Sequence, residues 1–406
     1  MAAKKKPAAK AAAKKPAAKH AAPKAKPKAA PARPAKAPPA PARKDAKVAP
    51  AAKAAPSAKA AAAVKPVLAG KPPASAPKPG GPAAKTAPAV EAAPGKVART
   101  PKTGSSRRPS SGPPFPSLPG TVKYDEPLGR HTTFRIGGPA KVLFTPGTPE
   151  AVGEAVAWAK QHNLPWLVLG LGSNVLIKDG GFPGLVIKIG KGLDTVTPKG
   201  NTWKVGAGLP TPLLARRTAD AGLAGVQRLV GVPGTVGGAV FMNAGAHGQD
   251  FEKVIQSVTV LTPKGDIEER TKKNIPFSYR RSGLDGYVVL ACTIKLEERS
   301  VEGVKADLAL MMKKRREGTP FDQPCCGSVF KNPDLMTAGR LIEKCGLKGR
   351  RVGGAEISSM HANYIVNRGG ATSEDVLKLI DVARTAVFKE FGLELELEVK
   401  VLGVAK

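Results

Sequence analysis

The sequence has few of the residues from which metal sites, disulfide frameworks and membrane spans are built. Its four cysteines form no Cys-x-x-Cys pair and no His/Cys spacing typical of zinc, so we expect reduced structural thiols in a reducing compartment. No run approaches the ~18 apolar residues that a membrane-spanning helix needs. The apolar stretch at residues 60–64 is too short for the core of a signal peptide. These absences predict a cytoplasmic protein without membrane insertion.

Acidic and aromatic residues are nearly missing from the first 120 residues. This segment holds 26 Lys and Arg against two acids, 25 of the 40 prolines, and one aromatic, Phe115. It cannot bury enough apolar surface to offset the entropy of ordering, so we expect disorder. Such a polybasic arm attracts nucleic acid or another polyanion without sequence preference. The alternative is a solubilising or spacing tail without a fixed partner.

Glycine is abundant in two short runs of the remaining sequence. Residues 231–246 read GVPGTVGGAVFMNAGA, and residues 170–174 read GLGSN between two apolar runs. Glycine lets main-chain N–H groups approach an anion closely, and no Gly-Lys-Ser/Thr is present to indicate a nucleoside triphosphate. The two runs together predict a site for the diphosphate of a dinucleotide. A strand-like segment, not a helix, follows residues 170–174, which argues against a Rossmann site.

Hydrophobic periodicity predicts an α+β fold rather than regular βαβ alternation. Thr372 and Asp375 form a capping-box pattern that starts the last expected helix. We expect helices over residues 149–161, 212–221, 304–316, 337–345 and 373–391. We expect strands over residues 142–144, 166–169, 175–177, 185–189, 203–205, 254–261, 288–296, 364–366 and 395–401.

Eight sequence blocks occur in a characteristic order between residues 120 and 404. They are TTFRIGG (132–138), GLGSN (170–174), the glycine-rich run (231–248), SYRRS (278–282), GSVFKNP (327–333), AGRLIE (338–343), HANYIVN (361–367) and EVK (398–400). In these blocks the chain resembles the UDP-N-acetylenolpyruvoylglucosamine reductases, the flavoenzymes of peptidoglycan precursor synthesis. Few residues separate Arg280 from Ser328 in the sequence. In this respect the chain resembles the shorter subclass of the family, which lacks an additional substrate-covering loop.

The resemblance implies an FAD-binding domain of the p-cresol methylhydroxylase type at residues 119–300, with α+β subdomains at about 119–190 and 191–300. An α+β substrate-binding domain would follow at 301–406, and residues 1–118 would be the basic tail. The implied reaction uses NADPH to reduce FAD, which then reduces the enolpyruvyl ether of the UDP-sugar to UDP-N-acetylmuramate. We expect a monomer, and the preference for NADPH over NADH stays open.

The resemblance also implies roles for individual residues. Ser328 would donate a proton, Arg280 would bind the substrate carboxylate, and Glu398 would assist. Glu394, Glu396 and Glu398 alternate with leucines, so all three would point to the same face of a strand. Only the family context selects Glu398 among them. Substrate contacts would come from Tyr279, Arg316, Lys331 and Asn332. Cofactor contacts would come from Gly170, Leu171, Gly172, Ser173, Asn174, Gly231, Pro233, Gly234, Thr235, Gly237, Gly238, Asn243, Gly245 and Ala246.

The sequence departs from the family pattern in two places. Leu171 stands where many relatives have glycine, and Cys325 and Cys326 immediately precede Gly327. We hypothesise that modification of Cys326 inhibits by displacing Ser328. Two other readings compete with the reductase: an alcohol or sugar oxidase on the same FAD scaffold, and a nucleic-acid-binding protein whose function lies in the tail.

Overall fold

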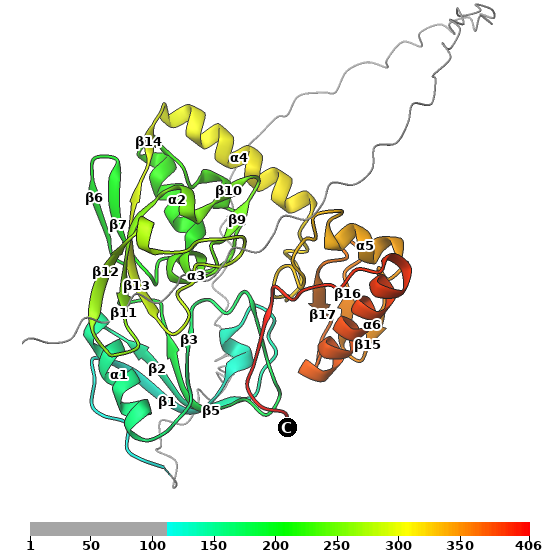
Figure 1. Cartoon of the computed structure of the whole chain (residues 1–406), viewed down its shortest axis with the longest axis horizontal. Coiled ribbons are helices and arrows are strands. Elements are labelled where there is room, and N and C mark those ends of the chain that lie inside the picture. The colour runs from blue at the N-terminus through cyan, green and yellow to red at the C-terminus, as the bar shows by residue number, and fades with distance from the viewer. Residues whose placement is uncertain (1–111) are drawn as a thin grey trace, which may run out of the picture. The chain divides into compact units, whose positions relative to one another are not determined.

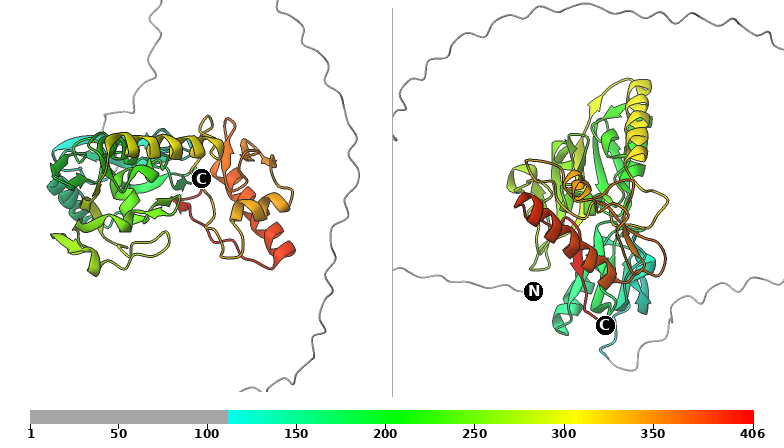
Figure 2. Two further views of the ribbon diagram at one scale, coloured as in Figure 1. Left: turned by 90° about the horizontal axis from the view of Figure 1, so that it is seen from above. Right: turned by 90° about the vertical axis from the view of Figure 1, so that its right-hand side faces the viewer.

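The computed structural model describes residues 112–406; the expected tail therefore lies almost wholly outside the described residues. Figures 1 and 2 show both sheets and helices, and their order along the chain lacks regular βαβ alternation, as expected for an α+β fold. Across residues 112–406, no helix combines the length and apolar character needed to cross a bilayer. The α-helices are α1 (Pro149–Gln161), α2 (Thr211–Asp220), α3 (Val236–Phe241), α4 (Val301–Glu317), α5 (Ala338–Lys344) and α6 (Ser373–Phe391).

A four-stranded sheet forms the first part of the described chain. It consists of β1 (Gly120–Pro127), β2 (Pro139–Pro146), β5 (Phe182–Lys188) and β3 (Trp166–Leu169), in that spatial order. β1 pairs antiparallel with β2, whereas β2 and β3 both run parallel to β5. Helix α1 packs on β2 and β5 through its buried apolar stripe. β3 ends at Leu169, and the first glycine run begins at the next residue, Gly170.

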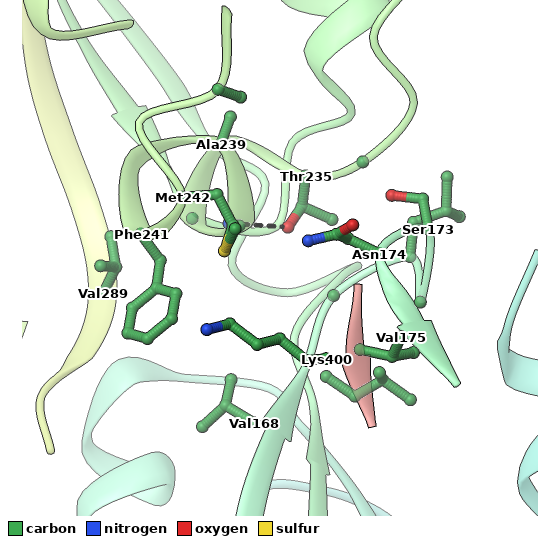
Figure 3. A pocket seen from close by; sticks show the side chains of 18 of the residues that line it. Val168, Ser173, Asn174, Val175, Thr235, Ala239, Phe241, Met242, Val289 and Lys400 are labelled. Atoms are coloured by element: carbon green, nitrogen blue, oxygen red, sulfur yellow. Dashed lines mark hydrogen bonds between the residues drawn. The ribbon is translucent and has the colours of Figure 1, made fainter. Parts of the chain in front are cut away.

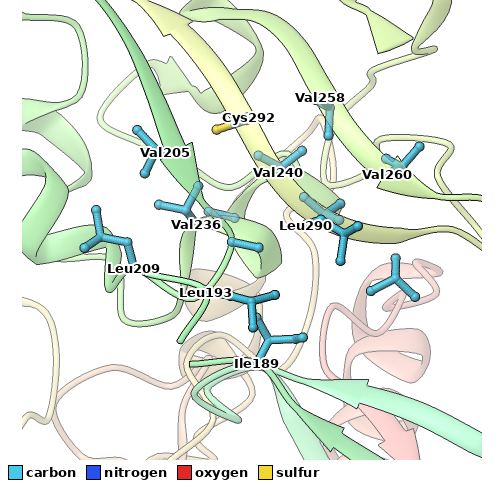
Figure 4. Close-up of a cluster of buried hydrophobic side chains, with 14 of the residues drawn as sticks. Ile189, Leu193, Val205, Leu209, Val236, Val240, Val258, Val260, Leu290 and Cys292 are labelled. Carbon is cyan, nitrogen blue, oxygen red and sulfur yellow. The ribbon is translucent and has the colours of Figure 1, made fainter. Parts of the chain in front are cut away.

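A five-stranded antiparallel sheet follows. Its order is β12 (Ile267–Thr271), β11 (Ile255–Leu261), β13 (Val288–Lys295), β7 (Thr202–Gly206) and β6 (Val196–Lys199). Helix α3 packs on β13 and β7. Figure 4 shows Val236 and Val240 of α3 against Val205, Leu290 and Cys292 of this sheet. Helix α4 packs on α2 and leads toward the last part of the chain (Figure 1).

The last part has its own core around α5, α6 and a small antiparallel sheet. That sheet consists of β15 (Arg351–Val352), β16 (Ala355–Ile357) and β17 (Ile365–Asn367). Short two-stranded pairs complete the fold: β4 (Val175–Ile177) with β18 (Lys400–Leu402), β8 (Leu223–Ala224) with β14 (Glu297–Glu298), and β9 (Gly245–Ala246) with β10 (Gln249–Asp250).

Most expected elements are confirmed, and one difference matters for the site. The capping box forms, because the Thr372 hydroxyl accepts from Asp375 N–H at 3.1 Å and the Asp375 carboxylate accepts from Thr372 N–H at 3.0 Å. The expected strand over residues 395–401 is wrong over most of its length, since only β18 is a strand there. Residues 396–398 bond instead to the loop at 329–331, and the chain reaches β4 only at Lys400.

Candidate active site

A cavity of about 690 Å³ lies where both glycine runs, the loop at residues 326–328 and the segment around β18 meet. Figure 3 shows part of it, with Asn174 and Ser173 on one side, Thr235 above them, and Phe241 and Val289 opposite. One region of the wall is main chain with little side-chain bulk. Another carries Arg280, Ser328 and Glu398, which come from three distant parts of the sequence.

The first glycine run presents free main-chain donors. Among the described residues, the N–H groups of Leu171, Gly172, Ser173 and Asn174 donate to no protein acceptor. Gly172 has φ +70°, and a Cβ there would lie 2.5 Å from the His131 carbonyl oxygen. The loop therefore requires glycine at this position. Consecutive N–H groups without an internal partner form an anion-binding concavity.

The second glycine run lies beside the first and contains helix α3. Thr235 is the N-cap of this helix, and its hydroxyl accepts from Gly238 N–H at 3.4 Å. A Cβ on Gly170 would lie 2.6 Å from that same hydroxyl, so the two runs approach closely. Ser173 Oγ donates to the Pro233 carbonyl at 2.8 Å and joins them directly. The close approach of the two runs is compatible with the predicted site for the diphosphate of a dinucleotide, which stays a prediction.

Arg280 lies in a tight turn and holds an uncommon backbone conformation. Its φ is +58°, in the left-handed region that costs a side-chain-bearing residue about 1–2 kcal/mol. Its Nε donates to Glu398 Oε1 at 2.9 Å and its Nη2 to the Gly245 carbonyl at 2.9 Å. The Tyr279 ring lies 4.9 Å from the guanidinium carbon. These contacts hold the guanidinium at the cavity wall.

Ser328 sits in a loop held on both sides. The Asn363 carbonyl accepts from Val329 N–H at 2.8 Å, and the Asn363 side chain bonds both the N–H and the carbonyl of Phe330. Cys326, on the other side of Ser328, is buried, and burial raises the pKa of its thiol well above the ordinary value. Because the thiolate is the reactive form, we expect this thiol to react slowly, and inhibition by its modification stays a prediction.

The contacts of Glu398 distinguish it from the nearby Glu396. It lines the cavity beside Arg280, whereas Glu396 pairs with Lys331 at 2.5 Å and its side chain is 65% exposed. Burial raises the pKa of the Glu398 carboxyl, and the Arg280 guanidinium opposes that rise. Glu398 N–H donates to Val329, and its carbonyl accepts from the Asn174 side chain. One residue thus links the Ser328 loop to the first glycine run.

The structure brings most of the predicted residues to one cavity, but not all of them. Asn243 has both ends of its amide bonded to protein, to Ser278 and Glu252. Asn332 accepts from Ala338 N–H. Those at the cavity wall are Gly170, Leu171, Gly172, Ser173, Asn174, Pro233, Gly234, Thr235, Gly237, Gly238, Gly245, Arg280, Ser328 and Glu398. Those outside the wall are Gly231, Asn243, Ala246, Tyr279, Arg316, Lys331 and Asn332.

Two cations at the cavity were missed by the sequence analysis. Arg315, not the exposed Arg316, lines the cavity and donates from Nε to the Gly231 carbonyl at 3.1 Å. Lys400 lines it as well, and its amine points toward Phe241 and Met242 (Figure 3). Lys400 and Leu402 lie two residues apart in β18 and both line the wall, but alternation alone did not identify Lys400, because it would also place the exposed Glu396 there. Nothing in the run of four basic residues distinguished Arg315.

Comparison with known proteins agrees with this site. Residues 140–270 match the family of FAD binding domains, and this range includes both glycine runs in full. The chain is therefore an FAD-containing oxidoreductase. Residues 319–402 match the C-terminal domain of UDP-N-acetylenolpyruvoylglucosamine reductase.

Relatives extend this match to 287 residues of the chain. UDP-N-acetylenolpyruvoylglucosamine reductases of Bacillus velezensis and Bacillus subtilis (strain 168) are 42% and 41% identical over 287 residues, 70% of this chain and 95% of each relative. The crystal structure of the Thermus caldophilus enzyme has 38% identity and a TM-score of 0.62, covering 71% of this chain and all of that one. The chain belongs to the UDP-N-acetylenolpyruvoylglucosamine reductase family.

Proposed function

We propose that the chain reduces UDP-N-acetylenolpyruvoylglucosamine to UDP-N-acetylmuramate at this cavity, using NADPH, as a step of peptidoglycan precursor synthesis. The observation that carries the proposal is the meeting of Arg280, Ser328 and Glu398 beside two glycine runs fitted to a diphosphate. The two glycine runs would hold FAD, which would supply the hydride chemistry that links NADPH to the β-carbon of the enolpyruvyl ether. The side chains of this protein must then manage the charge and the proton.

Ser328 is the proposed proton donor. Hydride addition at the β-carbon leaves negative charge on the α-carbon and its carboxylate, and the α-carbon then takes a proton from Ser328 Oγ. A serine hydroxyl is a weak acid, so it serves here only if its position is fixed against a strongly basic carbon. The Asn363 bonds to Val329 and Phe330 supply that fixation. Solvent returns the proton to Ser328 after product release.

Arg280 and Glu398 are the proposed stabilisers of the developing charge. The Arg280 guanidinium stays ionised and can offer two parallel N–H groups to the substrate carboxylate. Its bonds to Glu398 and Gly245 orient the planar group before substrate arrives, which avoids reorganisation during the reaction. Glu398 acts by orienting Arg280 or by supplying a proton itself, and its raised pKa is compatible with both roles.

Cationic residues near the cavity are proposed to bind the UDP-sugar diphosphate. Arg315 is favoured because it reaches the cavity wall. Tyr279, Arg316, Lys331 and Asn332 remain proposals from the resemblance. In the same way we propose that residues 119–300 bind the cofactor and 301–406 the substrate, in a cytoplasmic monomer, and that the basic residues 1–118 contact a polyanion without sequence preference.

An anaerobic stopped-flow experiment tests the reaction. The purified chain, loaded with FAD, is reduced with NADPH and mixed with UDP-N-acetylenolpyruvoylglucosamine, and the return of the visible flavin absorbance is followed. We expect rapid reoxidation with formation of UDP-N-acetylmuramate. A reduced flavin that the substrate leaves unchanged would refute the substrate assignment and favour an oxidase. Denaturation checks the same point, because flavin that stays attached to the chain would indicate a tethered oxidase cofactor.

A further inference from the structure

A lysine lies behind the first glycine run, on the side away from the cavity. Lys188 is the last residue of β5, and the next residue, Ile189, lines the cavity. Because successive residues of a strand point to opposite faces, Lys188 approaches the run from behind. Its Nζ donates to the Gly170 carbonyl and, at 3.3 Å, to the His131 carbonyl. Among the described residues it has no carboxylate within ion-pair distance.

The Gly170 contact sets the direction of the next N–H group. In a planar trans peptide the carbonyl of one residue and the N–H of the following residue point in opposite directions. Since the Gly170 carbonyl points back to Lys188, the N–H of Leu171 points away from Lys188. The same reasoning applies to Gly172, whose carbonyl accepts from Thr133 N–H at 3.1 Å, so that Ser173 N–H points away from Thr133. Both peptides thus present their donors away from the protein groups that hold them.

The surroundings of Lys188 do not neutralise its charge. β3 presents Leu169 opposite it, β2 presents Phe144 beside the preceding residue, and the adjoining turn presents His131. The His131 ring is itself paired with Glu126 at 2.9 Å. Burial is the one cause that lowers the pKa of Lys188, to about 8. A partly buried ammonium without a carboxylate is costly unless a bound anion compensates it.

We propose that Lys188 is a positioning residue for the cofactor: it fixes the Gly170 peptide with the Leu171 N–H toward the FAD diphosphate and places a positive charge behind the loop. The proposal rests on FAD as the cofactor of this site. Lys188 does not touch the reacting atoms and takes no part in hydride or proton transfer. Its effect is confined to cofactor affinity and to the pH dependence of that affinity.

Titration of the apoprotein with FAD, followed by quenching of flavin fluorescence between pH 6.5 and 9.5, tests this role. In the wild type the dissociation constant rises with pH above about 8, by at most about tenfold per pH unit, because FAD then binds together with a proton. Lys188→Met weakens binding by about tenfold or more at pH 7 and removes the pH dependence. Lys188→Arg keeps the charge and binds without the decline above pH 8. Lys204→Met, which removes an exposed strand lysine, behaves as the wild type.

Circular dichroism first establishes that each variant is folded. A Lys188→Met protein that binds FAD as tightly as the wild type, or that keeps the wild-type pH dependence, would overturn the proposal. Should Lys188→Met not fold, proton uptake on FAD binding is measured on the wild type by calorimetry in two buffers at pH 8.5, and its absence also refutes the role. These assays contain no UDP-sugar, so their failure is distinct from a failure of the proposed reaction. Loss of FAD binding by the wild type itself would refute both.

Discussion

The two ends of the cavity are built from different parts of the polypeptide. At the proposed cofactor end, main chain of the two glycine runs forms part of the wall, and the first run contributes N–H groups that donate to no described protein acceptor. At the proposed reaction end, three side chains, Arg280, Ser328 and Glu398, converge from segments more than forty residues apart. The cofactor end therefore depends on backbone angles, and the reaction end depends on the packing that brings separate segments together.

This difference predicts that substitutions at the two ends have separable effects. A side-chain change at the reaction end should spare FAD binding, because the glycine runs remain intact. A change of backbone freedom at the cofactor end should weaken FAD binding whatever the chemistry of the new side chain. Variants that lost both properties together would break the comparison.

The largest expected effect belongs to Ser328. Ser328→Ala removes the proposed proton donor, so reoxidation of the reduced flavin by substrate should slow by about 10²- to 10⁴-fold. NADPH reduction and FAD affinity should stay within twofold or so of the wild type, because neither needs the hydroxyl. Stopped-flow absorbance measures both half-reactions. Exposed Ser359→Ala is the control, and equal rates for the two variants would exclude Ser328 as the donor.

The next effect concerns the glycine geometry. Gly172→Ala places a Cβ 2.5 Å from the His131 carbonyl at φ +70°, so the loop must move and FAD affinity should fall by about tenfold or more. Gly200→Ala is a matched control, since Gly200 has φ +54° but no atom within 4 Å of a Cβ. It should lose about 1 kcal/mol of stability and no FAD affinity. Equal FAD affinities for the two variants would contradict a main-chain cofactor site.

A smaller effect should distinguish two adjacent arginines. Arg315→Met removes a cation from the cavity wall, so the KM for the UDP-sugar should rise by about tenfold, in line with the loss of one charged hydrogen bond. Arg316→Met changes an exposed side chain, where solvent weakens any contact with the substrate, and should raise KM by less than Arg315→Met does. Steady-state kinetics at saturating NADPH measures the pair. The opposite ranking would restore Arg316 as the substrate contact.

The smallest expected effect concerns how the free energy of unfolding changes with pH. Burial holds the pKa of Glu398 above its ordinary value, so the folded protein binds this proton more tightly than the unfolded chain does. The contribution of Glu398 to the free energy of unfolding is therefore present at low pH and is lost as pH rises from the ordinary value through the raised one. Glu398→Gln should flatten that decline in denaturant titrations. An unchanged slope would show that burial does not control this carboxyl.

Local signals in the sequence predicted much of the fold. Helices α1 and α6 were predicted with their observed bounds, because each combines an apolar stripe with a capping residue at its start. Helix α3 was missed, since two adjacent glycines in six residues argue against a helix. Thr235 and the packing of Val236 and Val240 on the sheet override that preference.

The site was predictable where the family resemblance named a residue and unpredictable where only tertiary contacts decide. Glu398 could not be separated from Glu396 by alternation, because the segment bonds to a loop before it joins a strand. Arg315 could not be chosen over Arg316 without the direction of helix α4. Lys188 has no sequence signal at all: its position behind the glycine run depends on the parallel pairing of β3 with β5.

The position of residues 396–402 in the chain has a consequence for the order in which the parts of the cavity form. It contributes Glu398, Lys400 and Leu402 to a cavity whose other described walls all precede it in the chain. A growing polypeptide can form both main sheets before this segment has been made, since domains fold as synthesis proceeds. The reaction end, however, gains its carboxylate only when residues 396–398 bond to the Ser328 loop. The proposed catalytic group is thus completed only after the segments that form both main sheets have been made.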